Sequence, residues 1–591
     1  MAYFSLGAYD ANVFIPQFAG LKQDDEIASD LRFAREAENV ETVRGVLQPM
    51  AACTVLGYEF PAKIETMVRF YRRWYTGEGS KDWIVVAAGG KIYAKQTSYD
   101  GAWSELPLPE YFKPNLILMI DDGTFVENTE RVNITRDVFR EKAAGRTGTF
   151  SFTYTPTQGW YGTDGDPAEY GVTFGFDINA YRQVHVMITY RFLPESIYRC
   201  NRYSCVNYEI NPEGAASPVD VLLMSNADRG MIMIVPPFTD EGPHAEWMVY
   251  KVNTPYNFGV IERYAERIWG GGITDEPDTL AYSRPYDPED WSGAYGDEEP
   301  EDVGGDVRQP SWDGDSFTAL RQFGGQLLGF KKNRVWRIMG TDPGEYVFKE
   351  QYGGGTPFAD TIAVETERIL MAEKDGLSVY DGMSVAPFRR NFIENVWKRV
   401  NREAMDEMCA ALYKDRYYLA VPLDGATANN ALIVYNIEEG TFLLYTDIYI
   451  ESMMATDEAL YATSSTLPGK ILIINYDSWE TGECTDRPTR WETPWMDFGR
   501  KTIAKGGYEI YFNPEVKGYP VTFRFSIETE KKVKSKTVTV PASTFKAKQK
   551  RVRFGGTSRR FRLIIETLPG HPGSMWRLTG GIQMVVETDP D

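Results

Sequence analysis

Groups able to give or take protons near neutral pH are scarce in this chain. It has three histidines, His185, His244 and His571, and a Ser-His-Asp triad would need one of them. The alternating run around His185 is typical of a strand, and the other two lie beside Gly and Pro, as loop residues do. No G-x-S-x-G, H-E-x-x-H or phosphate-loop motif occurs, because Gly353–Pro357 lacks the required lysine. We therefore expect no catalytic residue.

Carboxylates are abundant, so their presence alone does not distinguish one function from another. Two of them suffice for glycoside hydrolysis, which keeps a propeller glycan hydrolase open as an alternative. Ser311–Asp315 comes nearest to the S-x-D-x-G-x-x-W turn of sialidase-type propellers, but its glycine is misplaced and the turn occurs once. Asp164, Asp166 and the acidic run from Asp287 carry oxygen ligands of the kind that Ca²⁺ prefers. A turn and a solvated loop explain them better than a calcium site does, and we expect no metal and no cofactor.

Two groups of side chains suggest binding rather than catalysis. Trp160 and Tyr161 are adjacent aromatic residues that could stack on a glycan. Between Gly499 and Arg562 the chain has 17 Lys and Arg against four Glu, a local charge of +13 that leaves −34 for the rest of a chain of net charge −21. This asymmetry predicts that the two parts face different partners.

We expect the basic segment to dock against an acidic surface, with 531–536 forming a basic loop. The alternative is a solvated basic face without a partner. The expected docking residues are Lys531, Lys532, Lys534, Lys536, Lys548, Lys550 and Arg551.

Composition indicates the kind of secondary structure that holds these residues and the class of protein. The 36 Tyr, 31 Phe and 14 Trp favour half-buried pleated surfaces, and the net charge of −21 argues against a nucleic-acid-binding protein. The five cysteines are too few for a disulfide framework, so we expect free thiols, with a Cys200–Cys205 pair as the alternative. The first residues lack the basic patch and apolar run that are typical of a signal peptide, and no apolar run of about 20 residues occurs. We expect a protein that is made in a cytoplasm and stays soluble.

Repetition then predicts the fold. An apolar strand, a tight Gly or Asn turn and a second apolar strand recur about every 40 to 50 residues, the length of one four-stranded propeller blade. The sequence therefore predicts an all-β fold, a β-propeller of about seven or eight blades; separate β-sandwiches are the alternative. Helices are expected only around Thr135–Ala144 and around Phe392–Met408.

Two segments break the repeat. Residues 113–198 contain strictly alternating strands, which predict an inserted β-sandwich-like domain, and residues 487–591 read as a C-terminal β-sandwich module. An N-terminal arm and the first blades would then occupy 1–112, and the remaining blades 199–486. The nine acidic residues of 285–306 predict a solvated loop.

Short sequence motifs follow one another along the expected propeller and C-terminal module: Ala37–Leu47, Tyr264–Gly270, Asp278–Ser283, Lys374–Gly382, Tyr417–Pro422, Trp491–Gly499 and Trp576–Ile582. Their order along the chain is more specific than any one of them. Together they resemble β-propeller virion proteins of tailed bacteriophages, including podovirus tail nozzle or hub proteins. Phe150–Tyr154, Tyr170–Phe174 and Val184–Tyr190 are similar to a phage accessory module.

This resemblance implies a structural, non-enzymatic component of a phage tail. The expected assembly is a ring-shaped homo-oligomer, such as a hexamer, below the portal and adaptor. It would conduct DNA without specific binding and carry tail fibres, and an acidic lumen would repel the DNA. The virion tail is the expected location, after assembly in the host cytoplasm, without membrane insertion. A tail-tip adhesin that binds host surface glycan remains the first alternative.

Overall fold

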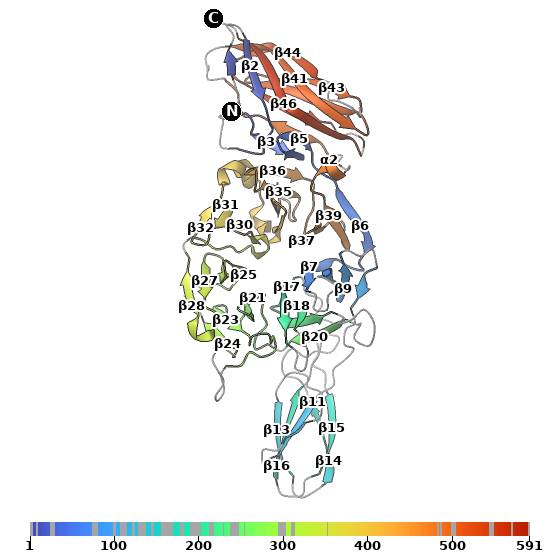
Figure 1. The fold of residues 1–591 in the computed structure, drawn as a ribbon, viewed down its shortest axis with the longest axis vertical. Helices are drawn as coiled ribbons and strands as arrows, with labels where there is room; N and C mark the ends of the chain where they lie inside the picture. The colour runs from blue at the N-terminus through green and yellow to red at the C-terminus, as the bar shows by residue number, and fades with distance from the viewer. Residues whose placement is uncertain are drawn as a thin grey trace. The chain divides into compact units, whose positions relative to one another are not determined.

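Strands make up nearly all the regular structure of the computed structural model (Figure 1). The structure describes residues 4–6, 10–23, 30–73, 81–97, 102–106, 202–211, 218–228, 230–236, 247–252, 254–293, 303–308, 314–351, 353–481, 484, 487–497, 504–542, 549–568, 571 and 573–588, and the backbone of strands between 115 and 189. Residue contacts divide the chain into two compact units. One is Phe60–Pro357, and the other combines Met1–Glu59 with Phe358–Asp591.

The unit Phe60–Pro357 contains four sheets with the consecutive antiparallel order of propeller blades. The first sheet has β7 (Ile64–Arg72), β8 (Lys81–Ala88), β9 (Lys91–Gln96) and β10 (Ser104–Glu105). The second has β17 (Ser204–Ile210), β18 (Val219–Asn226), β19 (Gly230–Val235) and β20 (Met248–Val252). The third has β21 (Val260–Tyr264), β22 (Arg267–Gly271), β23 (Thr279–Tyr282) and β24 (Gly305–Arg308). The fourth has β25 (Ala319–Phe323), β26 (Gln326–Phe330), β27 (Val335–Met339) and β28 (Val347–Glu350), with the 3-10 turn η3 (Pro343–Glu345) before β28.

A repeated Phe–Gly contact organises the third and fourth of these sheets. Phe258 and Phe317 precede the first strand of their sheets, and a glycine follows each of them twelve residues later, in the second strand. A Cβ on Gly270 would lie 2.4 Å from the Phe258 ring, and one on Gly329 would lie 2.7 Å from the Phe317 ring. Each ring therefore needs a glycine beneath it.

Tyrosine hydroxyls join neighbouring blades. Tyr208 in β17 donates a hydrogen bond of 2.7 Å to the carbonyl of Glu266 in the next sheet. Tyr264 in β21 donates one of 2.7 Å to the carbonyl of Gly340 in the sheet after that. Each ring is buried while its hydroxyl satisfies a turn carbonyl, which is one reason for the high tyrosine content.

Polar side chains also bridge the first strands of successive blades, which have no ladder partner on that edge. The amide of Asn207 accepts a hydrogen bond from Tyr71 N at 3.3 Å and donates one to Arg69 O at 3.2 Å. The hydroxyl of Ser204 accepts one from Ile261 N at 3.0 Å. These bonds replace part of the missing strand pairing.

Between the first and second sheets the chain forms a further group of strands: β11 (Asn115–Ile120), β12 (Phe125–Glu127), β13 (Asp137–Ala143), β14 (Thr147–Tyr154), β15 (Tyr170–Asp177) and β16 (Arg182–Thr189). They form two sheets, in the orders β12-β11-β16-β13 and β14-β15, consistent with an inserted sandwich. The helix predicted around Thr135–Ala144 is wrong, because Asp137–Ala143 is a strand that pairs with β16. Its Arg-Glu-Lys-Ala run favours a helix locally, and the long-range pairing overrides that preference.

The second unit holds three more blade-like sheets. Before the first lies η4 (Ala359–Thr361), and its strands are β29 (Ala363–Val364), β30 (Ile369–Glu373), β31 (Gly376–Tyr380) and β32 (Val385–Pro387). The segment η5 (Arg390–Ile393), α1 (Glu394–Lys398) and η6 (Arg402–Glu407) follows, which confirms helical turns around Phe392–Met408. The next sheet has β33 (Cys409–Tyr413), β34 (Arg416–Val421), β35 (Ala431–Asn436) and β36 (Thr441–Thr446). The last has β37 (Ser452–Ala455), β38 (Leu460–Thr463), β39 (Lys470–Ile474) and, from the N-terminal segment, β6 (Cys53–Glu59).

The C-terminal module is a sandwich of two sheets in the same unit. Its strands after the short helix α2 (Ser478–Thr481) are β40 (Thr489–Glu492), β41 (Lys505–Lys517), β42 (Val521–Thr529), β43 (Val533–Val540), β44 (Lys550–Ser558), β45 (Phe561–Thr567) and β46 (Met575–Thr588). One sheet runs β3-β40-β45-β42-β43 and the other β1-β2-β46-β41-β44. The ring of Phe512 in the second sheet lies 4.5 Å from that of Phe525 in the first, so the two inner faces share a core.

Five N-terminal strands take part in this module: β1 (Phe4–Leu6), β2 (Asp10–Ile15), β3 (Glu36–Glu38), β4 (Val40–Val43) and β5 (Val46–Pro49). In Figure 1 the blue strand β2 lies among the red strands of the C-terminus, and its register pairs Asp10–Ile15 with β46. The sequence did not indicate this exchange. Within the described residues one blade-like sheet, rather than several, precedes the insert.

The predicted fold class is confirmed: an all-β chain with β-propeller blades, an inserted β-sandwich and a C-terminal β-sandwich. Seven blade-like sheets are present among the described strands. The domain boundaries inferred from the sequence stay predictions.

Candidate functional site

The joint between the C-terminal sandwich and a propeller blade is a single continuous sheet. Its nine strands run β33-β34-β35-β36-β3-β40-β45-β42-β43, so β3 lies between the blade and the sandwich. Glu36, Ala37 and Glu38 pair antiparallel with β40, and Glu38 pairs parallel with Leu444 of β36. The N-terminal strand β3 thus joins the blade to the sandwich through its backbone pairing.

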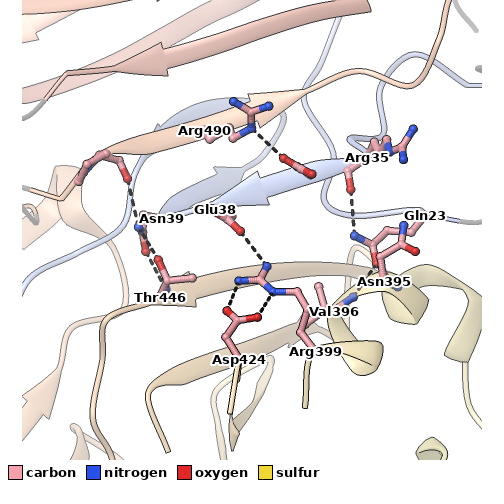
Figure 2. Close-up of polar contacts among 12 residues, drawn as sticks. Gln23, Arg35, Glu38, Asn39, Asn395, Val396, Arg399, Asp424, Thr446 and Arg490 are labelled. Atoms are coloured by element: carbon pink, nitrogen blue, oxygen red, sulfur yellow. Dashed lines mark hydrogen bonds and ion pairs between the residues drawn. The ribbon is translucent and has the colours of Figure 1, made fainter. Parts of the chain in front are cut away.

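The side chains of Asn39 and Gln23, beside β3, reinforce this joint (Figure 2). The Asn39 amide accepts from Thr446 N at 2.8 Å and donates to Thr446 Oγ1 at 3.0 Å and to Pro488 O at 3.1 Å. Asn39 has a φ of 55°, a left-handed conformation that Asn tolerates better than most residues. The buried Asn39 side chain therefore ties the blade strand β36 to the segment that leads into β40.

Gln23 performs a similar role at the start of α1. Its carbonyl oxygen accepts from Asn395 N at 2.9 Å and Val396 N at 3.2 Å, and its amide donates to Arg35 O at 3.0 Å. The residue before the helix, Ile393, supplies no side-chain cap. Gln23 thus satisfies two backbone donors that the first helical turn leaves open.

Opposite charges alternate across the outer face of the joined sheet. Arg399 contacts Glu38 at 3.1 Å and Asp424 at 2.8 Å (Figure 2). Arg490 contacts Glu36 and Glu566, each at 2.7 Å.

The ladder continues along the same sheet from β40 through β45 to β42. Glu492, which is almost fully buried, contacts both Arg490 and Arg562, and Arg562 contacts Glu528 at 2.7 Å. Networks of this kind stabilise more than isolated surface pairs because each side chain, once fixed, serves several partners.

A buried polar cluster lies beneath the hairpin β4–β5. Glu41 is 1% exposed, and its carboxylate accepts hydrogen bonds from Tyr445 Oη at 3.3 Å, Gln48 Nε2 at 3.3 Å and Ala51 N at 3.4 Å. The guanidinium of Arg416 lies 3.8 Å away. Burial nevertheless raises the pKa of Glu41 to about 7, from 4.5, because desolvation of the charged form outweighs these partners.

Other elements complete this cluster. Gln48 also donates to Asp477 Oδ1 at 2.8 Å, which links the hairpin to the residues before α2. Arg416 donates to Tyr476 O at 3.0 Å and lies 4.1 Å from the centre of that ring. Glu41 therefore lies where the N-terminal hairpin, the blade strands β34 and β36, and the segment leading into the C-terminal module meet.

The predicted basic loop at 531–536 is a hairpin turn followed by a strand. Thr529 N donates to Lys532 O at 2.9 Å and closes the turn, and β43 begins at Val533. Lys534 and Lys536 pair with Ile527 and Phe525, so they lie on the core side of edge strand β43.

Both lysines reach toward the other sheet from this exposed edge. Lys534 Nζ donates to the carbonyl of Gly555, and Lys536 Nζ lies 5.8 Å from the centre of the Phe554 ring. Inward charges of this kind protect an open sheet edge from pairing with another chain. The loop interpretation of 533–536 is therefore wrong.

Lys531 and Lys532 remain exposed at the tip of that hairpin. The turn before β45 lies beside them, because Arg560 contacts Glu530 at 3.2 Å. The exposed Arg559 belongs to the same turn, and its carbonyl accepts from the buried Lys505 Nζ at 2.5 Å.

Trp495 adds an aromatic ring at this place. Arg560 and Arg562 lie 5.1 Å and 4.9 Å from the centre of its half-buried ring. We call the turn 529–532, the turn 558–560 and Trp495 the basic end of the sandwich.

The other predicted binding residues are dispersed. Lys550 and Arg551 lie at the opposite end of β44, where Arg551 pairs with Tyr511 across the ladder. Trp160, Tyr161 and Lys548 lie outside the described residues.

The histidine and cysteines that the structure describes have packing partners or are free thiols. His571 stacks on Tyr519 at 3.6 Å in an exposed turn. Cys53, Cys205, Cys409 and Cys484 are free thiols, and Cys200 lies outside the described residues. Among the described residues no His, Cys, Asp and Glu group could hold a metal ion, and none of their helices has the length and apolar character to cross a membrane.

Sequence reasoning missed the Glu41 cluster and Trp495. Neither has a local signal: Tyr445, a hydrogen-bond partner of Glu41, lies 404 residues away in the chain, and the arginines beside Trp495 come from the distant strand β45 and the turn before it. Within the motif Ala37–Leu47, the structure explains Asn39 by its hydrogen bonds and Gly45 by its hairpin position, where it has a φ of 79°.

Comparison with known proteins does not indicate a function for this chain. No family model matches the sequence, and no curated protein matches it. One similar solved structure is a catalytically inactive virginiamycin B lyase from Staphylococcus aureus with quinupristin. The two are 10% identical, the match covers 63% of this chain and 96% of that one, and the TM-score is 0.25. A likeness at this level does not bear on the activity of this chain.

Proposed function

We propose that this chain is a structural, non-enzymatic subunit of a bacteriophage tail, a nozzle or hub component that assembles as a ring-shaped homo-oligomer. It stands below the portal and adaptor, lets DNA pass without binding it specifically, and carries tail appendages. The sequence phrases that resemble phage propeller proteins support the tail assignment.

The observation that carries the proposal is the nine-stranded sheet that runs from a blade into the C-terminal sandwich. A flexible linker would let the sandwich swing, whereas a shared sheet with an ion-pair ladder fixes it to the blade. Such a joint suits a part that transmits force or holds a neighbour in place. An enzyme or a simple adhesin module has no comparable need for it.

Localisation in the virion tests this proposal. Antibodies raised against the C-terminal module would be used for immunogold electron microscopy of purified virions and of ejected particles. We expect label on the tail directly below the capsid vertex, and ring-shaped particles from the recombinant full chain in negative stain.

Two results would contradict the proposal. Label at the distal fibre tips, with a monomeric recombinant protein that binds cell-wall polysaccharide, would favour an adhesin. Release of sugar from host envelopes, abolished by one carboxylate substitution, would favour a glycan hydrolase.

A further inference from the structure

The basic end of the sandwich carries three exposed cations, Lys531, Lys532 and Arg559, on two ordered turns. Lys531, Lys532 and Arg559 are exposed and form no ion pair with any residue that the structure describes. By contrast, most neighbouring cations of the sandwich are engaged: Arg553 contacts Glu509 at 2.6 Å and Arg562 contacts Glu528 at 2.7 Å. Three exposed cations without an ion pair to any described residue thus lie together at this end of the module.

The composition of this end resembles the centre of a protein interface. Trp and Arg are the residues most enriched among those that dominate binding energy, and Trp495 lies between Arg560 and Arg562. Both turns are fixed by hydrogen bonds and by the contact from Arg560 to Glu530. The backbone of this surface is therefore already ordered, so that binding a partner would cost little backbone entropy here.

The charge distribution of the chain favours a second copy of it as the partner. Residues outside Gly499–Arg562 carry −34, so a second copy of this chain offers mostly acidic surface. Two copies of net charge −21 repel each other unless a local attraction opposes that repulsion. The basic end is the described surface best suited to supply it.

We propose that the basic end docks against an acidic surface of a second copy of this chain. This inference rests on the proposed homo-oligomeric ring and names the contact that builds it. Lys534 and Lys536 do not belong to this contact, because they bridge the two sheets of their own sandwich. The docking set is Lys531, Lys532 and Arg559, flanked by Trp495.

The test compares the full-length chain with the triple variant Lys531→Gln, Lys532→Gln, Arg559→Gln. The matched control replaces three exposed cations outside the module, Lys332, Lys398 and Arg402, by Gln, so that both proteins have the same net charge. Self-association is measured by sedimentation velocity from about 50 mM to about 500 mM NaCl, a range over which the screening length falls several-fold. Negative-stain microscopy of the same samples records rings.

We expect the wild type and the control to associate, with association weakening as salt rises. The triple variant should associate about 10-fold more weakly at low salt, since each exposed ion pair is worth up to about a fivefold change in affinity. Its remaining association should depend less on salt. Circular dichroism and urea unfolding should match those of the wild type, because the three side chains are exposed.

The other outcomes separate the two proposals. If the triple variant forms rings as well as the wild type at every salt concentration, the docking inference is overturned and the ring proposal stands. If the wild type forms no oligomer at any salt, both fail. Binding of a double-stranded DNA fragment by the monomeric wild type, lost in the triple variant, would identify a nucleic-acid surface and overturn docking to a second copy.

Discussion

The buried carboxyl of Glu41 should make this protein less stable as pH rises through neutrality. The pKa of Glu41 is raised from 4.5 to about 7 by burial, so the native state holds a proton that the unfolded state releases. A native state that binds more protons loses stability as pH increases. The contribution is full below about pH 4.5 and is lost progressively as pH passes through about 7.

The magnitude follows from the shift. One pKa unit corresponds to about 1.36 kcal/mol, so the complete loss is about 3 kcal/mol. Between about pH 5.5 and about pH 8.5 the linkage relation gives a loss of about 2 kcal/mol. Arg416 stays charged throughout this range and does not contribute to the slope.

The substitution Glu41→Gln isolates this term. Glutamine has nearly the same shape, still offers a carbonyl oxygen to Tyr445, and does not titrate. We expect the stability of the variant relative to the wild type to rise by about 2 kcal/mol as pH increases from about 5.5 to about 8.5. Urea unfolding followed by tryptophan fluorescence measures it, and hydrogen exchange of peptides covering β4 and β5 provides a local readout.

The control is Glu403→Gln, which removes an exposed carboxylate in η6. It should leave the pH profile parallel to that of the wild type. If the difference between Glu41→Gln and the wild type is constant across the range, the carboxyl does not titrate there and the reasoning is refuted. A difference that moves in the opposite direction would mean that Glu41 is ionised and paired with Arg416.

Three further predictions concern contacts that the fold depends on. Asn39→Ala should cost about 2 to 4 kcal/mol in urea unfolding, because a buried amide loses three hydrogen bonds and alanine is strained at a φ of 55°, and Asn39→Gly should recover about 1 kcal/mol of this loss. Tyr264→Phe should cost about 1 to 2 kcal/mol by removing the 2.7 Å bond to Gly340, whereas the exposed Tyr449→Phe should change stability by less than about 0.5 kcal/mol. Replacing 113–198 with a short Gly-Ser bridge should leave a soluble, folded chain by circular dichroism, and loss of soluble expression would contradict that boundary.

The sequence predicted the elements whose signals are local. Period-two strands joined by glycine turns recur at blade spacing, and the described sheets follow that repeat. The twelve-residue Phe–Gly spacing of the third and fourth sheets is visible in the chain as well. The helix predicted around Thr135–Ala144 failed because good helix formers were overridden by pairing with β16.

The candidate site was predictable in charge but not in geometry. Counting lysines and arginines located the basic module, and the same count could not tell which cations are free. That distinction depends on register: Lys534 and Lys536 pair with core residues of β42, while Lys531 and Lys532 lie in the turn. A register shift of one residue would have turned Lys534 and Lys536 to the outer face of the sheet.

The exchange of N-terminal strands into the C-terminal half has a consequence for how the protein assembles. The bond between Asn39 and Pro488 joins residues 449 positions apart, so β3 cannot find β40 until most of the chain exists. At a synthesis rate of about 5 to 20 residues per second, the interval is roughly 20 to 90 s. Closing so long a loop slows folding more than it weakens the final state, because closure entropy grows only with the logarithm of length. The joint can therefore be completed only after β40 has been made, and the pairing of β2 with β46 requires still more of the chain. A ring that recruits subunits through the basic end would thereby require chains made at least through the turn 558–560, which leads into the same sheet that β3 fastens to the blade.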